Sequence, residues 1–235
     1  MQIDVLASSS LGNAYLISDG VTSILLEAGI PYKELQEKSG FKINEAAACF
    51  VSHGHFDHSK AVKDLLNATI DVYALPETLS TLKVTEHHRA YQVEPLKNIT
   101  IKTFKIMPIP MFHDCDCVGY MVYSEATKER LFFATDTYKI TVNPKGIDYL
   151  IVEINYQQEK VNRLVNEGIM ESSVRARLLY SHFEFSNALK WLKRIDKSRL
   201  KRIYIAHLSN ANSNAEEVKK AVISETGVPV TICEA

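Results

Sequence analysis

The sequence predicts an α/β fold in which helices cover two β-sheets, an αββα four-layer sandwich. Short apolar, β-branched segments fill the first two-thirds of the chain, helical periodicity appears between some of them, and helices dominate after residue 159. The 235 residues contain no Pro-, Gly- or Ser-rich linker, no low-complexity tract and no internal repeat. We therefore expect residues 1–235 to form a single domain, whose length suits a two-sheet sandwich.

The strand predictions rest on runs of apolar and β-branched residues bounded by Gly, Asn, Asp or Pro. Nine runs precede residue 159, and a tenth follows the late helices. In chain order they are Ile3–Leu6, Ala14–Ser18, Ser23–Leu26, Ala48–Val51, Val72–Ala74, Ile99–Ile106, Val118–Val122, Leu131–Ala134, Leu150–Ile154 and Ile203–Ala206.

Helices are predicted where apolar residues recur at helical spacing. Pro31 and Pro76 stand near two predicted starts, where a proline is tolerated because its missing N–H needs no partner. In chain order the predicted helices are Tyr32–Ser39, Ala61–Leu66, Glu77–Leu82, a segment from Glu159 with the stripe Val161, Leu164 and Val165, a segment with Leu189, Trp191, Leu192 and Ile195, and Glu216–Ser224.

Composition excludes several classes of protein. With 46% hydrophobic and 23% charged residues, the chain is neither disordered nor fibrous. Its 27 Lys and Arg nearly cancel its 28 Asp and Glu, so the net charge is −1. No whole-molecule basic field attracts nucleic acid, and any polyanion must bind a local patch.

The apolar runs and the cysteines predict a cytoplasmic protein without a membrane partner. No apolar run approaches the roughly 20 residues of a membrane helix, and the N-terminus lacks a signal-peptide pattern. Cys49, Cys115, Cys117 and Cys233 form no CxxC pair, which fits a reducing compartment. We interpret Cys115 and Cys117 as small apolar packing residues.

Histidines make the strongest local motif. His53, His55, Asp57 and His58 spell H-x-H-x-D-H between the predicted strand Ala48–Val51 and a helix. A loop leaving a strand end can aim two imidazoles at one cation while the next Asp and His turn toward a second. The motif therefore predicts two metal ions, which six residues alone cannot fully coordinate.

Further ligands are expected at later strand ends, and three residues stand there. They are His113 after the region Ile99–Ile109, Asp136 after Leu131–Ala134, and His207 after Ile203–Ala206. The predicted active site thus lies at strand ends along one edge of the sandwich.

These motifs resemble the metallo-β-lactamase-fold hydrolases over nearly the whole chain. Ser8–Asn13 followed by Ile24–Gly29 looks like the first hairpin of that superfamily. The likeness extends to its small nuclease-like YycJ/WalJ members: Ser-Ser-Ser-x-Gly-Asn at the start, Ile-x-Tyr after Glu153, His182 followed by Ser186 and Asn187, and His-Leu-Ser-x-x-Asn from His207. The family has the histidine directly before Leu-Ser-Asn, whereas three residues intervene here.

The resemblance implies a ligand assignment. His53, His55 and His113 would bind one metal, Asp57, His58 and His207 the other, and Asp136 would bridge them. Imidazole and carboxylate ligands suit zinc, manganese or iron equally, and we take zinc as the first candidate and manganese as the second. Two such ions activate a bridging hydroxide, so hydrolysis is the expected chemistry, and an aspartate at position 136 points away from β-lactam substrates.

A general acid distinguishes the candidate reactions. A phosphodiester releases an alkoxide that needs a proton, whereas a thioester releases a thiolate that hardly does. His182 is the candidate acid, or else a residue that caps or packs the following helix, and with Asp57 it forms the predicted catalytic set. Ser10, Asn13, Ser186 and Asn187 are the predicted substrate-binding residues. Glu153 is either an outer partner of a ligand imidazole or a surface strand-end charge.

The favoured function is a dinuclear-metal phosphodiesterase acting on nucleic acid or a nucleotide, in competition with three alternatives. The chain is also similar in size and layout to phage-encoded members that destroy cyclic-nucleotide defence signals as homodimers, so a homodimer is expected. A glyoxalase-like thioesterase or lactonase would use the same ligands without His182. A metal-stabilised binding protein without catalysis is the third.

Two surface features have open interpretations. Seven basic residues occur from Lys190 to Arg202 against one acidic residue, either a track for a phosphate backbone or a solvated face. The segment Lys83–Tyr91 is a lid, a dimer contact or an ordinary surface loop. Tyr138, two residues after Asp136, is expected at the pocket rim.

Overall fold

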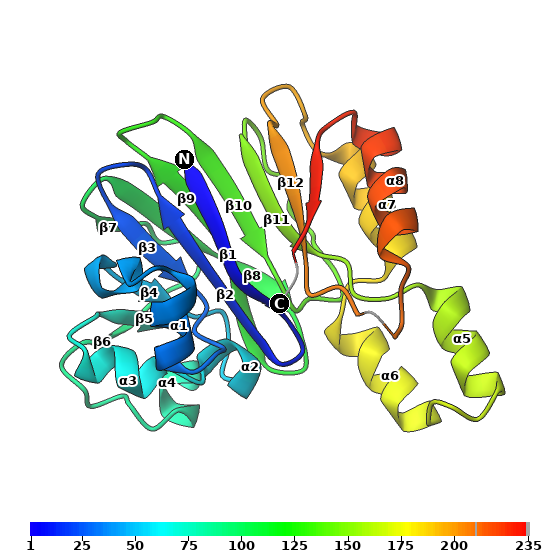
Figure 1. Cartoon of the computed structure of the whole chain (residues 1–235), viewed down its shortest axis with the longest axis horizontal. Coiled ribbons are helices and arrows are strands. Elements are labelled where there is room, and N and C mark those ends of the chain that lie inside the picture. The colour runs from blue at the N-terminus through cyan, green and yellow to red at the C-terminus, as the bar shows by residue number, and fades with distance from the viewer. Residues whose placement is uncertain (210, 234–235) are drawn as a thin grey trace. The chain divides into compact units, whose positions relative to one another are not determined.

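A computed structural model describes residues 1–209 and 211–233. Within this part of the chain, the strands form two sheets, of six and seven strands, accompanied by helices (Figure 1). The chain divides into two compact units, Met1–Pro110 with Cys115–Arg130 (unit 1) and Met111–Asp114 with Leu131–Cys233 (unit 2). The single-domain expectation stays a prediction.

The six-stranded sheet belongs to unit 1, in the order β1-β2-β3-β4-β5-β6. The first three strands pair antiparallel and the rest pair parallel. A register shift between Val5 and Ala7 interrupts the β1–β2 ladder. The strands are β1 (Gln2–Ser9), β2 (Gly12–Ser18), β3 (Ser23–Leu26), β4 (Cys49–Phe50), β5 (Val72–Ala74) and β6 (Ala90–Gln92).

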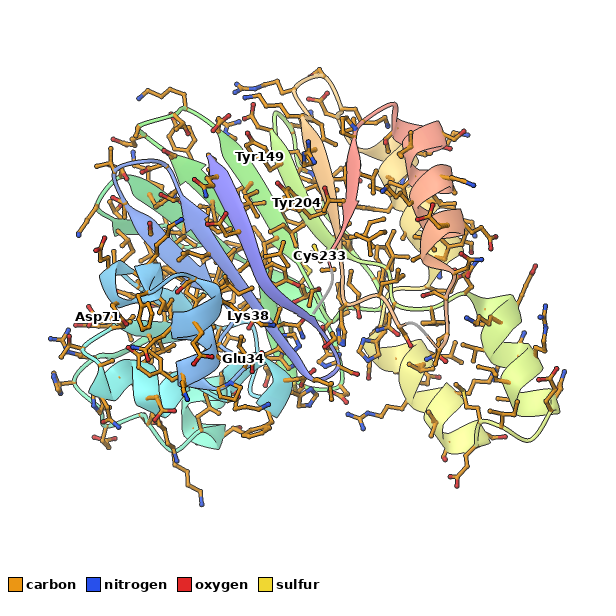
Figure 2. All side chains as sticks on the ribbon, viewed as in Figure 1. Glu34, Lys38, Asp71, Tyr149, Tyr204 and Cys233 are labelled. Atoms are coloured by element: carbon orange, nitrogen blue, oxygen red, sulfur yellow. The ribbon has the colours of Figure 1, made fainter. Side chains whose placement is uncertain are left out.

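Helices of unit 1 bury their apolar faces against this sheet. Leu35, Leu65 and Leu79 come from three different helices and join one core with strand residues such as Leu25. On the outer face of α1, Lys38 Nζ lies 3.1 Å from Glu34 Oε1, an i,i+4 pair (Figure 2). The elements are α1 (Tyr32–Lys38), the 3₁₀ turn η1 (Lys42–Glu45), α2 (Phe56–Ser59), α3 (Val62–Asn67) and α4 (Pro76–Thr81).

The predicted strand Ile99–Ile106 is wrong, because the chain reverses inside it. It forms β7 (Ile99–Ile101) and the start of β8 (Phe104–Phe112), paired antiparallel with Ile99 opposite Ile106. Lys102 takes φ 49°, the left-handed conformation of a tight turn. β9 (Asp116–Ser124) follows.

Unit 2 contains four parallel strands in the order β13-β12-β11-β10. Trp191 is buried beside Phe132, with ring centroids 6.1 Å apart, and its indole N–H donates to the Val142 carbonyl. Helices α7 and α8 pack together (Figure 1). The elements are β10 (Arg130–Ala134), β11 (Tyr149–Glu153), α5 (Gln158–Asn166), α6 (Ser172–Ser181), α7 (Phe185–Arg194), β12 (Arg202–Ala206), α8 (Ala215–Thr226) and β13 (Val230–Ile232).

Parallel pairing aligns the ends of β10, β11 and β12. Ala134 lies opposite Val152, and Glu153 lies opposite Ala206. Residues that follow these positions therefore lie at one edge of the sheet, where open α/β sheets bind ligands. None of the helices formed by the described residues combines the length and the apolar composition of a membrane span.

Candidate metal centre

In unit 1, the H-x-H-x-D-H motif runs from the turn after β4 into α2, with His53 and His55 before the helix and Asp57 and His58 inside it. His53 and His58 are fully buried, whereas Asp57 is partly exposed. The His53 ring centroid lies 4.6 Å from that of His55 and 4.3 Å from that of His58. The structure therefore gathers the imidazoles into one cluster, as a metal loop requires.

Outer partners hold this cluster in place. The Ser52 hydroxyl lies 2.8 Å from His53 Nδ1. Glu27, fully buried, places Oε2 3.5 Å from His58 Nδ1 and accepts the Ser52 backbone N–H at 3.3 Å. Carboxylates in this position orient metal-binding histidines. Sequence reasoning missed Glu27, although a charge directly after the buried strand β3 was the available signal.

The two predicted substrate contacts in unit 1 have different surroundings. Ser10 is exposed in the β1–β2 turn. Asn13 is fully buried, its amide donates to the Ser9 carbonyl at 3.0 Å, and its Nδ2 lies 3.3 Å from His58 Nε2. Its contacts support the metal loop, and a direct role in substrate binding stays a prediction.

Gly29 makes the metal loop sensitive to a single methyl group. A Cβ on Gly29 would lie 1.7 Å from the Asp57 carbonyl oxygen, so Gly29→Ala must push the loop away. We expect a loss of roughly 1–3 kcal/mol in unfolding free energy and weaker zinc binding, measured by urea unfolding and zinc titration. Gly40→Ala is the control: at φ +57 with no atom within 4 Å it adds backbone strain alone. Unchanged zinc affinity in Gly29→Ala would contradict this account.

In unit 2, Asp136, Glu153, His182 and His207 form a second cluster. One ligand atom from each lies within 4.8 Å of the others. His207 Nδ1 lies 2.7 Å from Asp136 Oδ1 and 3.3 Å from Glu153 Oε1, and His182 Nδ1 lies 2.6 Å from Glu153 Oε1. The structure thus brings together two predicted ligands, the predicted acid and a buried carboxylate.

Glu153 is the outer partner of the imidazoles that the sequence allowed, and not a surface charge. It is fully buried, and its Oε2 accepts backbone N–H groups of Thr137 at 3.1 Å and Phe183 at 3.3 Å. One carboxylate therefore links the end of β11 to the Asp136 loop and to His182.

Backbone strain marks the same strand ends. Asp136 has φ 46° and His207 has φ 51°, and in unit 1 Glu27 has φ 65°. Left-handed conformations of non-glycine residues cost of order 1–3 kcal/mol and cluster at functional sites. The fold thus keeps these side chains in place at a cost.

The electrostatics of the unit 2 cluster favour positive charge. Burial alone lowers the pKa of His207, but the charge and hydrogen bond of Asp136, together with Glu153, raise it to about 10. Burial also lowers the pKa of His182, whereas Glu153 raises it above its ordinary value. For Glu153, burial raises the pKa, yet His182 and His207 bring it below its ordinary value. Two buried carboxylates that hold protons on imidazoles also suit a divalent cation.

His113 lies in unit 2, where a backbone carbonyl group orients its imidazole. Its Nδ1 donates to the Ser181 carbonyl at 2.9 Å, so Nε2 is the acceptor nitrogen. Asp114 Oδ1 lies 3.2 Å from Nε2. Burial lowers the pKa of His113, although Asp136 acts in the opposite direction, and the neutral form is the one that binds a metal.

The donor sets in both units fit divalent metal ions. Unit 1 offers imidazoles and a carboxylate with outer partners on His53 and His58. Unit 2 offers two imidazoles and two carboxylates in a buried cluster. Such nitrogen and oxygen donors are those that zinc binds.

Ser186 and Asn187 at the start of α7 line different pockets. Ser186 donates to Glu184 Oε2 at 2.6 Å, and the Asn187 backbone N–H donates to the same oxygen, which caps the helix. The pocket beside Asn187, of about 440 Å³, is lined by Tyr138, Lys139, Ile140, Phe183, Asn187, Lys190, Trp191 and Arg194. Ser186 lines another, beside α5.

The basic residues between Lys190 and Arg202 in unit 2 make different contacts. Lys197 donates to three backbone carbonyls at the end of α7. Arg199 and Lys201 pair with the buried Asp148. Lys190 and Arg194 line the pocket. The interpretation as one continuous phosphate track is therefore too broad.

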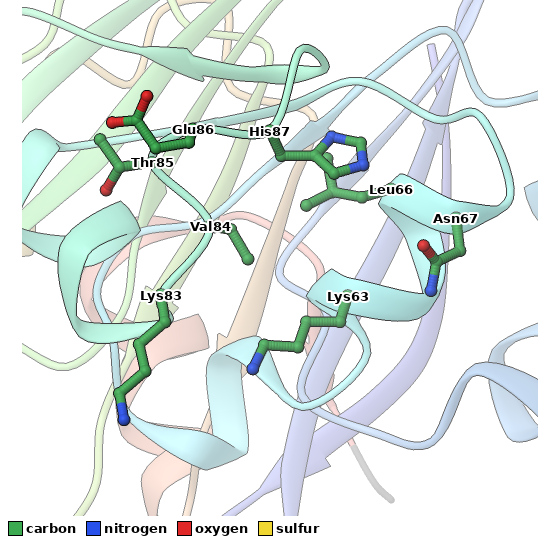
Figure 3. Close-up of a pocket in the computed structure, with 8 residues that line it drawn as sticks. All are labelled: Lys63, Leu66, Asn67, Lys83, Val84, Thr85, Glu86 and His87. Carbon is green, nitrogen blue, oxygen red and sulfur yellow. The ribbon is translucent and has the colours of Figure 1, made fainter.

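Unit 1 has its own pocket, of about 670 Å³, at the segment after α4 (Figure 3). Lys63, Leu66 and Asn67 of α3 face Lys83, Val84, Thr85, Glu86 and His87 across it. None of the predicted metal ligands lines this pocket.

The fold and these histidine–carboxylate clusters define the metallo-β-lactamase-fold metallohydrolases. A family model described as a beta-lactamase superfamily domain matches residues 22–207, and the chain belongs to this family. This membership confirms the predicted fold class.

Known proteins share both sequence and fold with this chain. Exodeoxyribonuclease WalJ of Streptococcus pneumoniae is 22% identical over 237 residues, which cover 94% of this chain and 86% of the relative. The metallo-β-lactamase fold protein YhfI from Bacillus subtilis superposes with a TM-score of 0.75 at 17% identity, covering 99% of this chain and 95% of that one. A diphosphatase from the PhnP family has a TM-score of 0.70 at 17% identity, covering 99% and 94%.

Proposed function

We propose that the protein is a dinuclear-metal phosphodiesterase that cleaves nucleic acid or a nucleotide. The observation that favours this reaction most is the hydrogen-bonded pair of His182 and Glu153 in the unit 2 cluster. An acid of this kind assists an alkoxide leaving group and is superfluous for a thiolate. WalJ, similar over most of the chain, is by name an exodeoxyribonuclease, which agrees with phosphodiester chemistry.

We assign seven residues as ligands of two metal ions. His53, His55 and His113 would hold one, Asp57, His58 and His207 the other, and Asp136 both. The partners described for His53, His58 and His113 support this assignment, because metal-binding imidazoles are oriented through their second nitrogen. Divalent ions at such sites polarise phosphoryl oxygens and make water nucleophilic at neutral pH. Zinc is the first candidate and manganese the second.

The chain's own residues would handle the leaving group. Glu153 holds His182 through Nδ1 and keeps its imidazolium stable, so Nε2 is the nitrogen that can give a proton to the departing oxygen. Asp57 is partly exposed beside the buried His58, and as a metal ligand it would also orient the nucleophilic water. In this mechanism Glu153 is a positioning residue and His182 is catalytic.

The pocket beside Asn187 supports an anionic substrate. Lys139, Lys190 and Arg194 line it together with the Asn187 amide and Tyr138. Its volume of about 440 Å³ lies in the range of small-molecule sites. A nucleotide or one end of a nucleic acid strand therefore suits it, and a phosphate on the substrate would bind the three cations.

Charge removal at this pocket should separate substrate binding from catalysis. In the double variant Lys190→Gln, Arg194→Gln, we expect KM for a DNA oligonucleotide to rise. Because two phosphate contacts are lost, the slope of log affinity against log salt concentration should fall in magnitude by about one to two. The same assay on Lys193→Gln is the control, because Lys193 is exposed on α7 and does not line the pocket. Equal salt slopes in all three proteins would show that the pocket does not bind the substrate backbone.

A substrate comparison tests the proposed reaction. The purified protein with added zinc or manganese would be given DNA oligonucleotides, cyclic nucleotides, a thioester and a lactone. Cleavage of a phosphorus substrate with no thioester turnover is the expected result, and steep salt dependence would identify nucleic acid rather than a cyclic nucleotide. Thioester or lactone turnover alone would overturn the proposal. The homodimer and the cytoplasmic location stay predictions.

A further inference from the structure

We propose that Cys115 is a thiolate ligand of the metal ion bound by His53 and His55, an inference that rests on the proposed metal centre. Cys115 is exposed, so its interpretation as a packing residue is wrong. Its Sγ lies 4.0 Å from His55 Nε2. One donor atom each from His53, His55 and Cys115 lies within 4.8 Å of the others, and all three belong to unit 1.

These separations match what one ion requires. Zinc binds sulfur at about 2.3 Å and nitrogen at about 2.0–2.1 Å in tetrahedral geometry, which places a sulfur and a nitrogen ligand about 3.5 Å apart. The observed 4.0 Å is close to that value. A small rotation of the exposed Cys115 side chain would close the difference without disturbing the core.

Cys117, two residues after Cys115 and inside β9, offers a matched comparison. It is buried, and its Sγ lies 3.8 Å from His53 Nδ1, the nitrogen that also contacts the Ser52 hydroxyl. A histidine held through Nδ1 binds a metal through Nε2, so Cys117 lies at the orienting side of the ring. Cys117 is therefore a packing neighbour of His53 rather than a ligand.

A thiolate at this position has a consequence for metal choice. Soft sulfur ligands favour zinc over manganese, whereas a purely imidazole and carboxylate site accepts both. Cys115 would thus make the ion on His53 and His55 a zinc ion even where manganese is available.

X-ray absorption and cobalt spectra of the full-length protein test this ligand. Zinc-loaded wild type and Cys117→Ser should show a sulfur neighbour of zinc at about 2.3 Å, and Cys115→Ser should show only nitrogen and oxygen. In the cobalt-substituted proteins, the thiolate-to-cobalt charge-transfer band should disappear only in Cys115→Ser, while the ligand-field bands persist. Zinc should also lose part of its preference over manganese in Cys115→Ser.

Two other kinds of result would contradict Cys115 as a metal ligand. A sulfur-free zinc shell in metal-loaded wild type, or a sulfur signal lost only in Cys117→Ser, would overturn the assignment and leave the proposed phosphodiesterase standing. Wild type that binds no zinc or cobalt at all would instead reject the metal centre on which both proposals depend.

Discussion

The double variant His55→Ala, Asp57→Ala should lose metal-dependent phosphodiester hydrolysis by far more than 100-fold. Removing outer-shell partners of metal ligands typically costs about 10–100-fold, and this change removes two ligands assigned to different ions. Both residues lie in the turn before and at the start of α2, partly exposed, so their removal should leave the buried core of unit 1 intact.

The matched control is His87→Ala, His88→Ala. These two imidazoles stack on each other at 4.8 Å outside the metal loop. The control should bind as much zinc as wild type and keep its turnover. Undiminished hydrolysis in the His55, Asp57 variant, with urea unfolding showing a folded protein, would remove the loop from the active site.

His182→Ala should have an effect that depends on the leaving group. General acids contribute about 10²–10⁴-fold, so cleavage of a DNA or nucleotide diester, which expels an alkoxide, should fall by that amount. Hydrolysis of bis(p-nitrophenyl) phosphate should change little, because nitrophenolate leaves without a proton. A structural defect would lower both rates together, and equal losses on the two substrates would therefore reject His182 as the acid.

The pH dependence of diester cleavage is a second test of His182 as the general acid. Burial alone lowers the pKa of His182, but Glu153 raises it above the ordinary value, so the protonated acid persists as pH rises. Diester cleavage should therefore decline at a pH above the ordinary histidine pKa of about 6.5. In Glu153→Gln this decline should move to lower pH, and in His182→Ala it should disappear.

Local patterns made the metal loop predictable. His53 and His55 follow a buried strand, and Asp57 and His58 lie in the helix that comes next, so all four residues belong to one local strand–turn–helix segment. His207 could be proposed because it directly follows a recognisable strand, and Asp136 because it stands two residues after one. Glu27 and Glu153 follow or end strands too, but a lone carboxylate there is as often a solvated charge. Only the pairing of distant strands shows that Glu153 is buried against His182 and His207.

Two strands, one helix and one turn could not be predicted from the sequence, for other physical reasons. β6 and β13 contain three residues each and both include a polar residue, whereas the equally short β5 has none. In α6, apolar and polar side chains are spread around the helix and only Ser181 is buried, so no stripe marks it. The turn at Lys102 contains neither glycine nor proline, which is why β7 and β8 read as one strand.

Titration of zinc into metal-free protein, with turnover of bis(p-nitrophenyl) phosphate as the readout, would show whether two bound metal ions carry out the hydrolysis. We expect hydrolysis to rise from background to a plateau as two equivalents of zinc bind, and manganese to support hydrolysis as well as zinc or less well. Two bound ions without hydrolysis of this or any nucleotide diester, or hydrolysis by the metal-free protein, would contradict it.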